Sequence, residues 1–334
     1  MRATRGRILV IRGGAIGDFI LTLPAIAALR NQFPEAHLEV LGYPHIAQLA
    51  LAGGVVDRVQ PIEARGLAGF FAARGELDAA MADYFARFDI VVSYLFDPDL
   101  IFQTNVAQCA RAQFIQCPHR PNEAERIHAT QVYLKPLERL AIFAADPVPR
   151  LVVAQASVPA GSGSIPAPRL CSPDNTSLGR DAQATRRLEA CATLALHPGS
   201  GSEKKNWPEQ NWAGLMQRLV AETSAKLLIV GGEAEGEKLE RLAKLLPKER
   251  VEVARSIPLA ELAVQLGKCA GFIGHDSGIS HLAAAVGVPA LVLWGGSIEE
   301  VWRPQGERVV IVREEGGLGA LTVERVRAEL SRLP

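Results

Sequence analysis

Short runs of apolar, often β-branched residues alternate along this chain with longer amphipathic stretches, and this alternation limits its fold more than any other feature. The expected strands lie at residues 8–11, 38–41, 90–94, 193–196, 227–230, 251–253, 272–273, 290–293 and 309–312. The stretches that we predict as helices between them include 19–31, 210–222, 238–246 and 259–267. This order predicts an α/β protein with parallel sheets and crossover helices, and the near-continuous apolar strands predict that both faces of each sheet are covered.

The length and a central shift in composition predict two domains. At 334 residues the chain exceeds one ordinary core. Residues 157–176 are rich in Pro, Gly, Ser and Ala and lack periodicity, which indicates a linker. We therefore expect an N-terminal domain at 1–156, a linker with a lead-in helix at 157–190, and a C-terminal domain at 191–334. The last expected helix, 323–330, can pack on either domain. Ligands of parallel sheets bind at the carboxyl ends of the strands, so a cleft between the domains is the expected site.

Charge and cysteine content exclude several classes of protein. Lys and Arg together number 36, as do Asp and Glu, so no net charge attracts the chain to nucleic acid. The first apolar run is interrupted by Arg12 and Asp18, which argues against a signal peptide or a membrane span. The five cysteines are scattered without a CxxC motif, so we expect reduced thiols and a cytoplasmic protein.

Residues 274–287, GHDSGISHLAAAVG, form the most informative motif. A loop of small residues around Asp276 leads from an expected strand into a helix, whose first N–H groups and positive dipole end favour an anion. Ser277 and Gly278 add no bulk, and His281 lies about one helical turn further on. The motif predicts an anion-binding site with a carboxylate and an imidazole beside it. The alternative is a helix cap by Asp276, with His281 satisfied within the fold.

Three further loops follow expected strands. In 12–18, RGGAIGD, Asp18 lies near a helix start, and from spacing alone capping is favoured over a role as general base. In 197–208, HPGSGSEKKNWP, small and hydroxyl residues beside two lysines resemble a phosphate loop, or else form a solvated turn. In 231–237, GGEAEGE, a carboxylate could accept from ribose hydroxyls, although acids in a first helical turn are the simpler explanation. Together, glycine-bearing loops after successive strands favour one shared nucleotide site.

The four motifs, in this order, resemble glycosyltransferase family 9, the ADP-heptose:lipopolysaccharide heptosyltransferases. The specific parts are the DSGISHL block at 276–282 and the KNWP block at 205–208. The resemblance covers most of the chain and is weakest between about residues 53 and 180. It implies a GT-B architecture, in which two Rossmann-like, doubly wound parallel-sheet domains face a central cleft. The first domain would bind the acceptor and the second the nucleotide sugar.

The resemblance also implies residue roles in an inverting transfer that uses no metal or other cofactor. Asp18 would be the general base, Glu235 would bind the donor ribose, and Asp276 and His281 would lie at the donor sugar. The residues implied for the donor diphosphate are Ser200, Gly201, Lys205, Ser277, Gly278 and Ile279. The adenine edge would lie near Ser256 and Ile257. The implied partners are an ADP-heptose donor and a glycan or glycolipid acceptor, with peripheral contact to the inner face of the cytoplasmic membrane.

Some features depart from the family or leave the function open. His275 stands where a small or polar residue is commoner, and donor preference could differ there. The N-terminal half carries no acceptor motif; Arg65, Arg74, Arg111 and Arg120 are its candidate contacts for a lipid-linked acceptor. The alternatives are a GT-B enzyme acting on a UDP- or GDP-sugar, including an epimerase, and a nucleotide-sugar-binding protein without turnover. A nicotinamide or flavin oxidoreductase is disfavoured because GxGxxG is absent.

Overall fold

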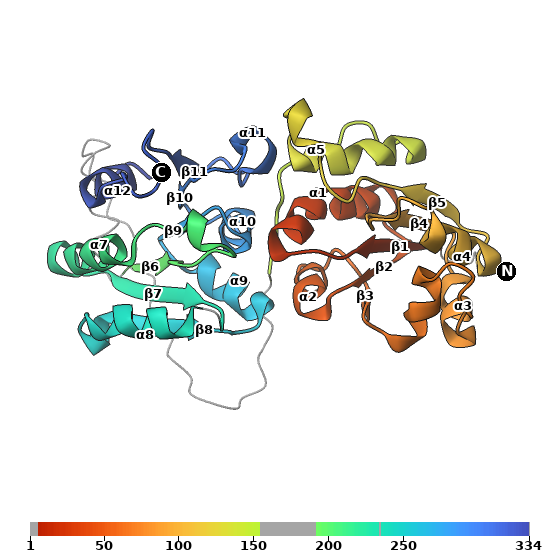
Figure 1. Cartoon of the computed structure of the whole chain (residues 1–334), viewed down its shortest axis with the longest axis horizontal. Coiled ribbons are helices and arrows are strands. Elements are labelled where there is room, and N and C mark those ends of the chain that lie inside the picture. The colour runs from red at the N-terminus through yellow and green to blue at the C-terminus, as the bar shows by residue number, and fades with distance from the viewer. Residues whose placement is uncertain (1–5, 154–191, 234, 334) are drawn as a thin grey trace.

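The computed structural model describes residues 6–153, 192–233 and 235–333. These residues form two parallel sheets, one in each half of the chain (Figure 1). The predicted linker at 157–190, with its lead-in helix, lies outside the described residues.

The N-terminal sheet has five parallel strands in the order β3-β2-β1-β4-β5. Its strands are β1 (Arg7–Arg12), β2 (His37–Gly42), β3 (Arg58–Pro61), β4 (Ile90–Ser93) and β5 (Gln113–Gln116). Its helices are α1 (Ile16–Gln32), α2 (Pro44–Ala52), α3 (Ala79–Phe85), α4 (Ile101–Cys109) and α5 (Ala129–Leu134), with 3-10 turns η1 (Arg65–Phe71), η2 (Glu123–Glu125) and η3 (Lys135–Leu140).

The C-terminal sheet has six strands in the order β11-β10-β9-β6-β7-β8, which is the 3-2-1-4-5-6 order of a Rossmann sheet read from β8. Its strands are β6 (Thr193–Leu196), β7 (Lys226–Gly231), β8 (Val251–Arg255), β9 (Gly271–His275), β10 (Ala290–Leu293) and β11 (Val309–Val312). Its helical segments are η4 (Glu203–Lys205), α7 (Glu209–Glu222), α8 (Gly236–Lys244), η5 (Lys248–Arg250), α9 (Leu259–Gly267), α10 (Gly278–Ala285), α11 (Glu299–Trp302) and α12 (Val323–Leu330).

The predicted α/β fold class and all nine predicted strands are confirmed, whereas β3 and β5 were not expected. Both missed strands lie at an edge of the N-terminal sheet and carry the short sequences RVQP and QFIQ. Edge strands are less buried than central ones and need no continuous apolar run, so this pattern does not reveal them. Helices α2 to α5 were also outside the prediction. Helix α12 packs against α7, so of its two expected positions the structure places it on the C-terminal half (Figure 1).

Apolar layers cover both faces of each sheet, as the strand sequences predict. The outward layers belong to separate clusters, one with α3 and α4 and one with α7, α8 and α12. The layers that face each other share one buried cluster, which runs through α1, α2 and α5 into α9 and α10. In Figure 1 these helices meet at the centre of the molecule, where α1 packs against α10 and α2 against α9. Helix α1 lies between a sheet and another helix, which explains why ten of its residues are buried.

This topology places the sequence motifs at one location. In each sheet the strand order reverses beside the first strand, between β1 and β4 and between β6 and β9. Ligands of open α/β sheets bind at such switch points, outside the carboxyl ends of the strands. Asp18 in the first turn of α1, Lys205 in η4 and Asp276 directly after β9 follow the carboxyl ends of β1, β6 and β9, respectively.

Candidate active site

A cavity of about 1160 Å³ lies between the two halves. The N-terminal half lines it with the loop after β1, the first turns of α1, and the segments after β4 and β5. The C-terminal half contributes the loop after β6, the start of α10, and residues 296–298 and 302. The predicted site residues that line it are Asp18, Gly201, Lys205, Asp276, Ser277, Gly278 and His281. The structure therefore brings together residues that lie up to 263 positions apart in the chain.

Asp18 faces this cavity from the first turn of α1. Its Oδ2 accepts a hydrogen bond from the Ala15 N–H at 3.2 Å, and its side chain is 33% exposed. Gly14 has φ +98°, and a Cβ there would lie 3.0 Å from the same oxygen. A glycine is needed because the loop turns sharply against the carboxylate. Asp18 thus caps the loop and is still open to the cavity, so the two roles weighed from its sequence position are compatible.

Arg12 lies behind Asp18 at the end of β1. Its side chain is 3% exposed, and the guanidinium donates to the carbonyl oxygens of His119 at 2.9 Å and Asp18 at 3.2 Å. The guanidinium carbon lies 4.7 Å from the ring centre of Tyr133 and 5.7 Å from that of Tyr94. One of its nitrogens is 3.8 Å from Asp18 Oδ1. A buried cation therefore stands next to the candidate base.

Lys205 and Asp276 form an ion pair across the C-terminal wall of the cavity. The ammonium nitrogen of Lys205 lies 2.6 Å from Oδ2 of Asp276, and the Ser297 hydroxyl donates to the same oxygen. Asp276 is 8% exposed, while the Lys205 side chain is 38% exposed. The pair holds an ammonium group at the cavity surface, where it could bind an anionic ligand.

The N-terminus of α10 supplies the second anion-binding element. Ser277 caps the helix by accepting the Ser280 N–H, and Gly278 begins it. A Cβ on Gly278 would lie 2.9 Å from the backbone nitrogen of Gly17, so the first turns of α10 and α1 are in contact. Both helices thus direct their positive ends toward the space between the sheets.

His281 is buried where these two helices meet and also lines the cavity. Burial lowers the pKa of His281 well below its ordinary value, so the ring is neutral at neutral pH. Its Nδ1 has no hydrogen-bond partner among the described residues. That nitrogen is itself shielded from solvent, so a ligand in the cavity would meet the neutral ring through its other atoms.

His275 supports the loop after β6 and does not line the cavity. It is fully buried, its Nε2 accepts the Trp207 N–H at 2.8 Å, and its Nδ1 donates to the Gly199 carbonyl at 3.2 Å. Burial lowers the pKa of His275 to about 3, so the ring stays neutral. His275, which we expected to affect donor preference, therefore stabilises the segment that contains Lys205.

Five predicted residues do not line this cavity, namely Ser200, Glu235, Ser256, Ile257 and Ile279. The Ser200 hydroxyl donates to the Ser202 carbonyl within its own loop. The Glu235 carboxylate accepts the Gly232 N–H at 2.9 Å and packs against Gly199. Ser256 has φ +50° and follows β8. The side chains of Ser200 and Glu235 are thus engaged locally at the carboxyl ends of β6 and β7, and the ligand roles of all five residues remain predictions.

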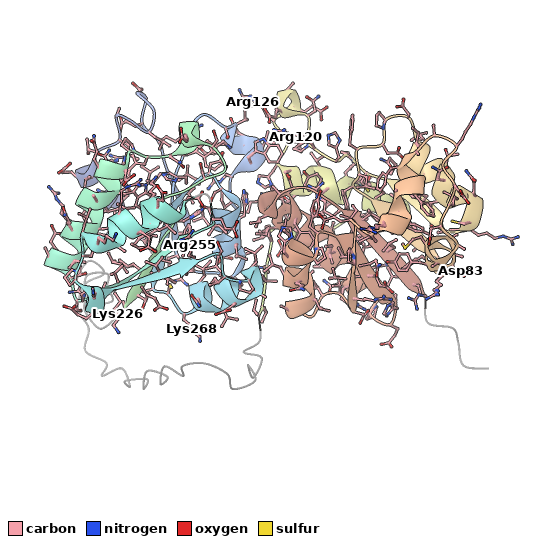
Figure 2. The ribbon with its side chains drawn as sticks, turned by 60° about the horizontal axis from the view of Figure 1, so that its bottom comes forward. Asp83, Arg120, Arg126, Lys226, Arg255 and Lys268 are labelled. Carbon is pink, nitrogen blue, oxygen red and sulfur yellow. The ribbon has the colours of Figure 1, made fainter. Side chains whose placement is uncertain are left out.

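The rim of the cavity contains residues outside the four sequence motifs, and of these Arg120 was already a candidate acceptor contact from the sequence. Glu123 accepts hydrogen bonds from Trp302 Nε1 at 2.9 Å and from Arg120 at 3.0 Å, and the Arg120 guanidinium carbon lies 5.2 Å from the Trp302 ring centre. Arg126 pairs with Glu300 at 2.8 Å. Figure 2 shows Arg120 and Arg126 where the two halves meet. No local motif identifies the contacts of Trp302 with Glu123 or of Glu300 with Arg126, because each joins residues more than 170 positions apart.

No helix in the described ranges is long and apolar enough to cross a bilayer. The same part of the chain has no group of three or more His, Cys, Asp or Glu side chains placed to hold a metal ion.

Comparisons with known proteins agree with the motif order. Residues 167–325 match the family model described as glycosyltransferase family 9 (heptosyltransferase). The chain is 30% identical over 114 residues to lipooligosaccharide heptosyltransferase 2 of Haemophilus influenzae, covering 33% of this chain and 32% of that protein. It is 37% identical over 91 residues to lipopolysaccharide heptosyltransferase 1 of Pseudomonas aeruginosa, covering 27% and 25%. The matched segments thus span no more than a third of these two relatives.

Solved structures extend the likeness to the whole chain. The E. coli heptosyltransferase WaaC with ADP superposes with a TM-score of 0.67 at 19% identity, covering 98% of this chain and 99% of that one. WaaC with ADP-2-deoxy-2-fluoro heptose gives 0.65 at 20% identity, covering 98% and 99%. At this identity the likeness establishes the fold, and the expected GT-B architecture of two facing parallel-sheet domains is confirmed.

Proposed function

We propose that this chain, of which residues 167–325 match the model of glycosyltransferase family 9, is an inverting glycosyltransferase that moves a heptose from ADP-heptose to a lipopolysaccharide-core or similar glycan acceptor. The observation that carries this proposal is the cavity in which Asp18 of one half faces Lys205 and the α10 N-terminus of the other. The names of the WaaC structures, with ADP and with a fluorinated ADP-heptose, support the choice of donor.

The proposed reaction is a single displacement at the anomeric carbon of the donor. The acceptor oxygen forms a bond to this carbon while the bond to the β-phosphate oxygen breaks, and attack from the opposite face inverts the configuration. Asp18 takes the proton of the acceptor hydroxyl as general base. ADP leaves with its developing charge near Lys205 and the N–H groups of Ser277 and Gly278, which are fixed in place before the reaction.

We further propose that the acceptor reaches the cavity from a lipid surface, at the inner face of the cytoplasmic membrane. Phe71 and Phe96 line the cavity and are 48% and 71% exposed. Arg120, alone among the four arginines considered from the sequence, lines the cavity with them. Exposed aromatic and basic side chains beside the opening suit an amphipathic, anionic acceptor.

Replacing Asp18 by Asn tests the proposed base. Asn is nearly the same size, so the kcat of transfer should fall by about 10²- to 10⁴-fold while the Kd for ADP changes less than about 2-fold. Heptose transfer is measured by ADP release, and Kd by calorimetry. Asp78→Asn is the matched control, since Asp78 also caps a helix start but lies outside the cavity. Full transfer by the Asp18 variant would remove Asp18 from this role.

Replacing Lys205 by Ala tests the proposed diphosphate contact. Loss of a charge-assisted hydrogen bond of about 1.5–3 kcal/mol should weaken ADP binding roughly 10- to 100-fold and leave adenosine binding unchanged. Lys226→Ala is the control, because Lys226 lies at the amino end of β7, away from the cavity (Figure 2). Equal losses for ADP and adenosine would contradict a diphosphate role.

The nucleotide is tested by a thermal-shift panel of ADP, UDP and GDP with their sugar conjugates. A ligand at about 100 times its Kd adds about 2.7 kcal/mol of stability, which is enough to rank them. ADP and ADP-heptose should give the largest shifts. A preference for UDP or GDP would overturn the ADP-heptose assignment and favour the alternative, a GT-B enzyme that acts on a UDP- or GDP-sugar.

A further inference from the structure

Arg12 has surroundings that packing alone does not explain. Its side chain is 3% exposed, it lines the cavity, and its Nε has no hydrogen-bond partner among the described residues. Buried donors are normally satisfied, so an incompletely paired guanidinium is costly and calls for an explanation. The two hydrogen bonds that it does make go to carbonyl oxygens, those of His119 and Asp18.

The other buried groups around Arg12 do not neutralise its charge. Burial raises the pKa of Tyr94 and of Tyr133, so both phenols are neutral at ordinary pH. Burial likewise raises the pKa of the nearby Cys117 thiol to about 12. Within the described residues, the carboxylate within 4.0 Å of this guanidinium is that of Asp18, whose Oδ1 is 3.8 Å away. Asp18 is therefore the carboxylate that pairs with Arg12 among the described residues.

The guanidinium is also held rigidly. Tyr133 lies over it at 4.7 Å and Tyr94 at 5.7 Å, and the Tyr94 hydroxyl donates to the Tyr133 carbonyl at 2.8 Å, which joins the two sides of this cage. The guanidinium also donates a hydrogen bond to the His119 carbonyl oxygen at 2.9 Å, which restrains it from a third side. Because the guanidinium of Arg12 is held in place, its positive charge attracts the Asp18 carboxylate to one position at the cavity wall.

We propose that Arg12, caged by Tyr94 and Tyr133, is a positioning residue that holds the Asp18 carboxylate where it can take the acceptor proton. This inference rests on the proposed function, because it assigns Arg12 an effect on transfer through Asp18. Arg12 acts on kcat and leaves the donor site, which is built by the C-terminal half, unchanged.

Arg12→Met tests this role, because Met keeps an unbranched side chain between the two tyrosines and removes the charge. Its kcat should fall at least 10-fold while the Kd for ADP stays within 2-fold of wild type. Arg12→Lys, which keeps the charge, should recover part of the lost kcat. Arg30→Met is the matched control: Arg30 also donates to loop carbonyls and pairs with an aspartate, Asp57, but lies at the far end of α1 outside the cavity. It should keep wild-type kcat at a temperature where it is folded.

A second measurement does not depend on turnover. The thermal unfolding midpoints of Arg12→Met, Asp18→Asn and the double variant form a cycle. If the two side chains are paired, the loss of Tm caused by Arg12→Met is smaller in the Asp18→Asn background. Additive losses of Tm, or a kcat of Arg12→Met within 2-fold of wild type, would overturn the proposal.

The two proposals fail in different ways. If the wild-type protein transferred no sugar from ADP-heptose, the proposed function would fail, and the Tm cycle would still decide whether Arg12 positions Asp18. If Asp18→Asn lost transfer while Arg12→Met kept it, the proposed function would stand and the role of Arg12 would fall.

Discussion

At the scale of single residues, the loop that carries Lys205 depends on a buried imidazole. His275 joins this loop at two points, through the Trp207 N–H and the Gly199 carbonyl, and its ring packs edge-on against Trp212. Both hydrogen bonds require the neutral tautomer that carries its proton on Nδ1. The unusual residue before Asp276 therefore acts on the loop rather than on a ligand in the cavity.

Replacing His275 by Phe should destabilise the protein. The buried Trp207 N–H and Gly199 carbonyl would each lose a partner, at a cost of about 1–3 kcal/mol per group. The free energy of unfolding should fall by roughly 2–6 kcal/mol in urea denaturation, and ADP binding should weaken because Lys205 is no longer held. His45→Phe, at an exposed histidine, is the control. A His275 variant as stable as wild type would contradict this account.

At the scale of elements, the contact between α1 and α10 aligns the two halves of the site. It is made close by two glycines, Gly17 and Gly278, which let the first turns approach without side chains between them. Asp18 follows one glycine and Ser277 precedes the other. The spacing of these helices therefore sets the distance between the proposed base and the proposed diphosphate site.

Gly278→Ala should separate the two helices. The new Cβ would lie 2.7 Å from Ile16 Cβ and 2.9 Å from the Gly17 nitrogen, and the latter is backbone that cannot turn away. Overpacking of this kind costs about 1–3 kcal/mol. We expect a lower free energy of unfolding in urea and a larger radius of gyration in small-angle X-ray scattering.

Gly17→Ala is the matched control for this interface. Its Cβ would lie 3.4 Å from His281 Cδ2 and 3.6 Å from Gly278 Cα, which are ordinary contacts. It should leave the radius of gyration unchanged. Equal effects of the two substitutions would show that the close approach at Gly278 does not set the spacing.

At the scale of the whole molecule, one apolar cluster connects the two sheets, and hydrogen bonds across the rim add to it. His128 belongs to this rim, since its Nε2 lies 2.9 Å from the Arg303 carbonyl oxygen. Together with His197, His275 and His281 it is buried, and in each case burial lowers the pKa of the ring. The folded protein therefore holds four imidazoles in their neutral form.

Because of these histidines, we expect the free energy of unfolding to decrease as the pH falls below neutral. An unfolded histidine has a pKa of about 6.5, so below this pH the unfolded chain binds protons that the folded chain does not. The stability that comes from keeping these rings neutral is fully present above about pH 6.5. It is lost as the pH falls, and for His275 the loss continues down to about pH 3. Each such ring contributes up to about 1.4 kcal/mol per pH unit.

Urea unfolding at pH 7.5, 6.0 and 5.0 measures this effect. The free energy of unfolding should decrease at each step, and His197→Asn should reduce the slope. His119→Asn, at an exposed histidine, should leave the slope as it is. A free energy of unfolding that is constant or rises between pH 7.5 and 5.0 would contradict the prediction.

The sequence by itself determined the α/β class, the central strands and the loops that follow β1, β6 and β9. These features are local, because strand periodicity and glycine-rich turns are encoded within a few neighbouring residues. The edge strands β3 and β5 were not predicted, because they are short and partly exposed. The sequence likewise indicated Asp18, Lys205 and His281 as candidates, but could not choose between a cap and a base for Asp18.

Only the tertiary structure decided which of these residues share a cavity and which buried residues contact them. Arg12 opens the RGGAIGD motif, but the motif gives it no role, and its partners come from the segment after β4, from α5 and from the segment after β5. Glu123 meets Trp302 only because the two sheets face each other. Such contacts join residues tens to hundreds of positions apart, and they form only when each sheet and its helices pack together or when the two halves meet, so no local pattern records them.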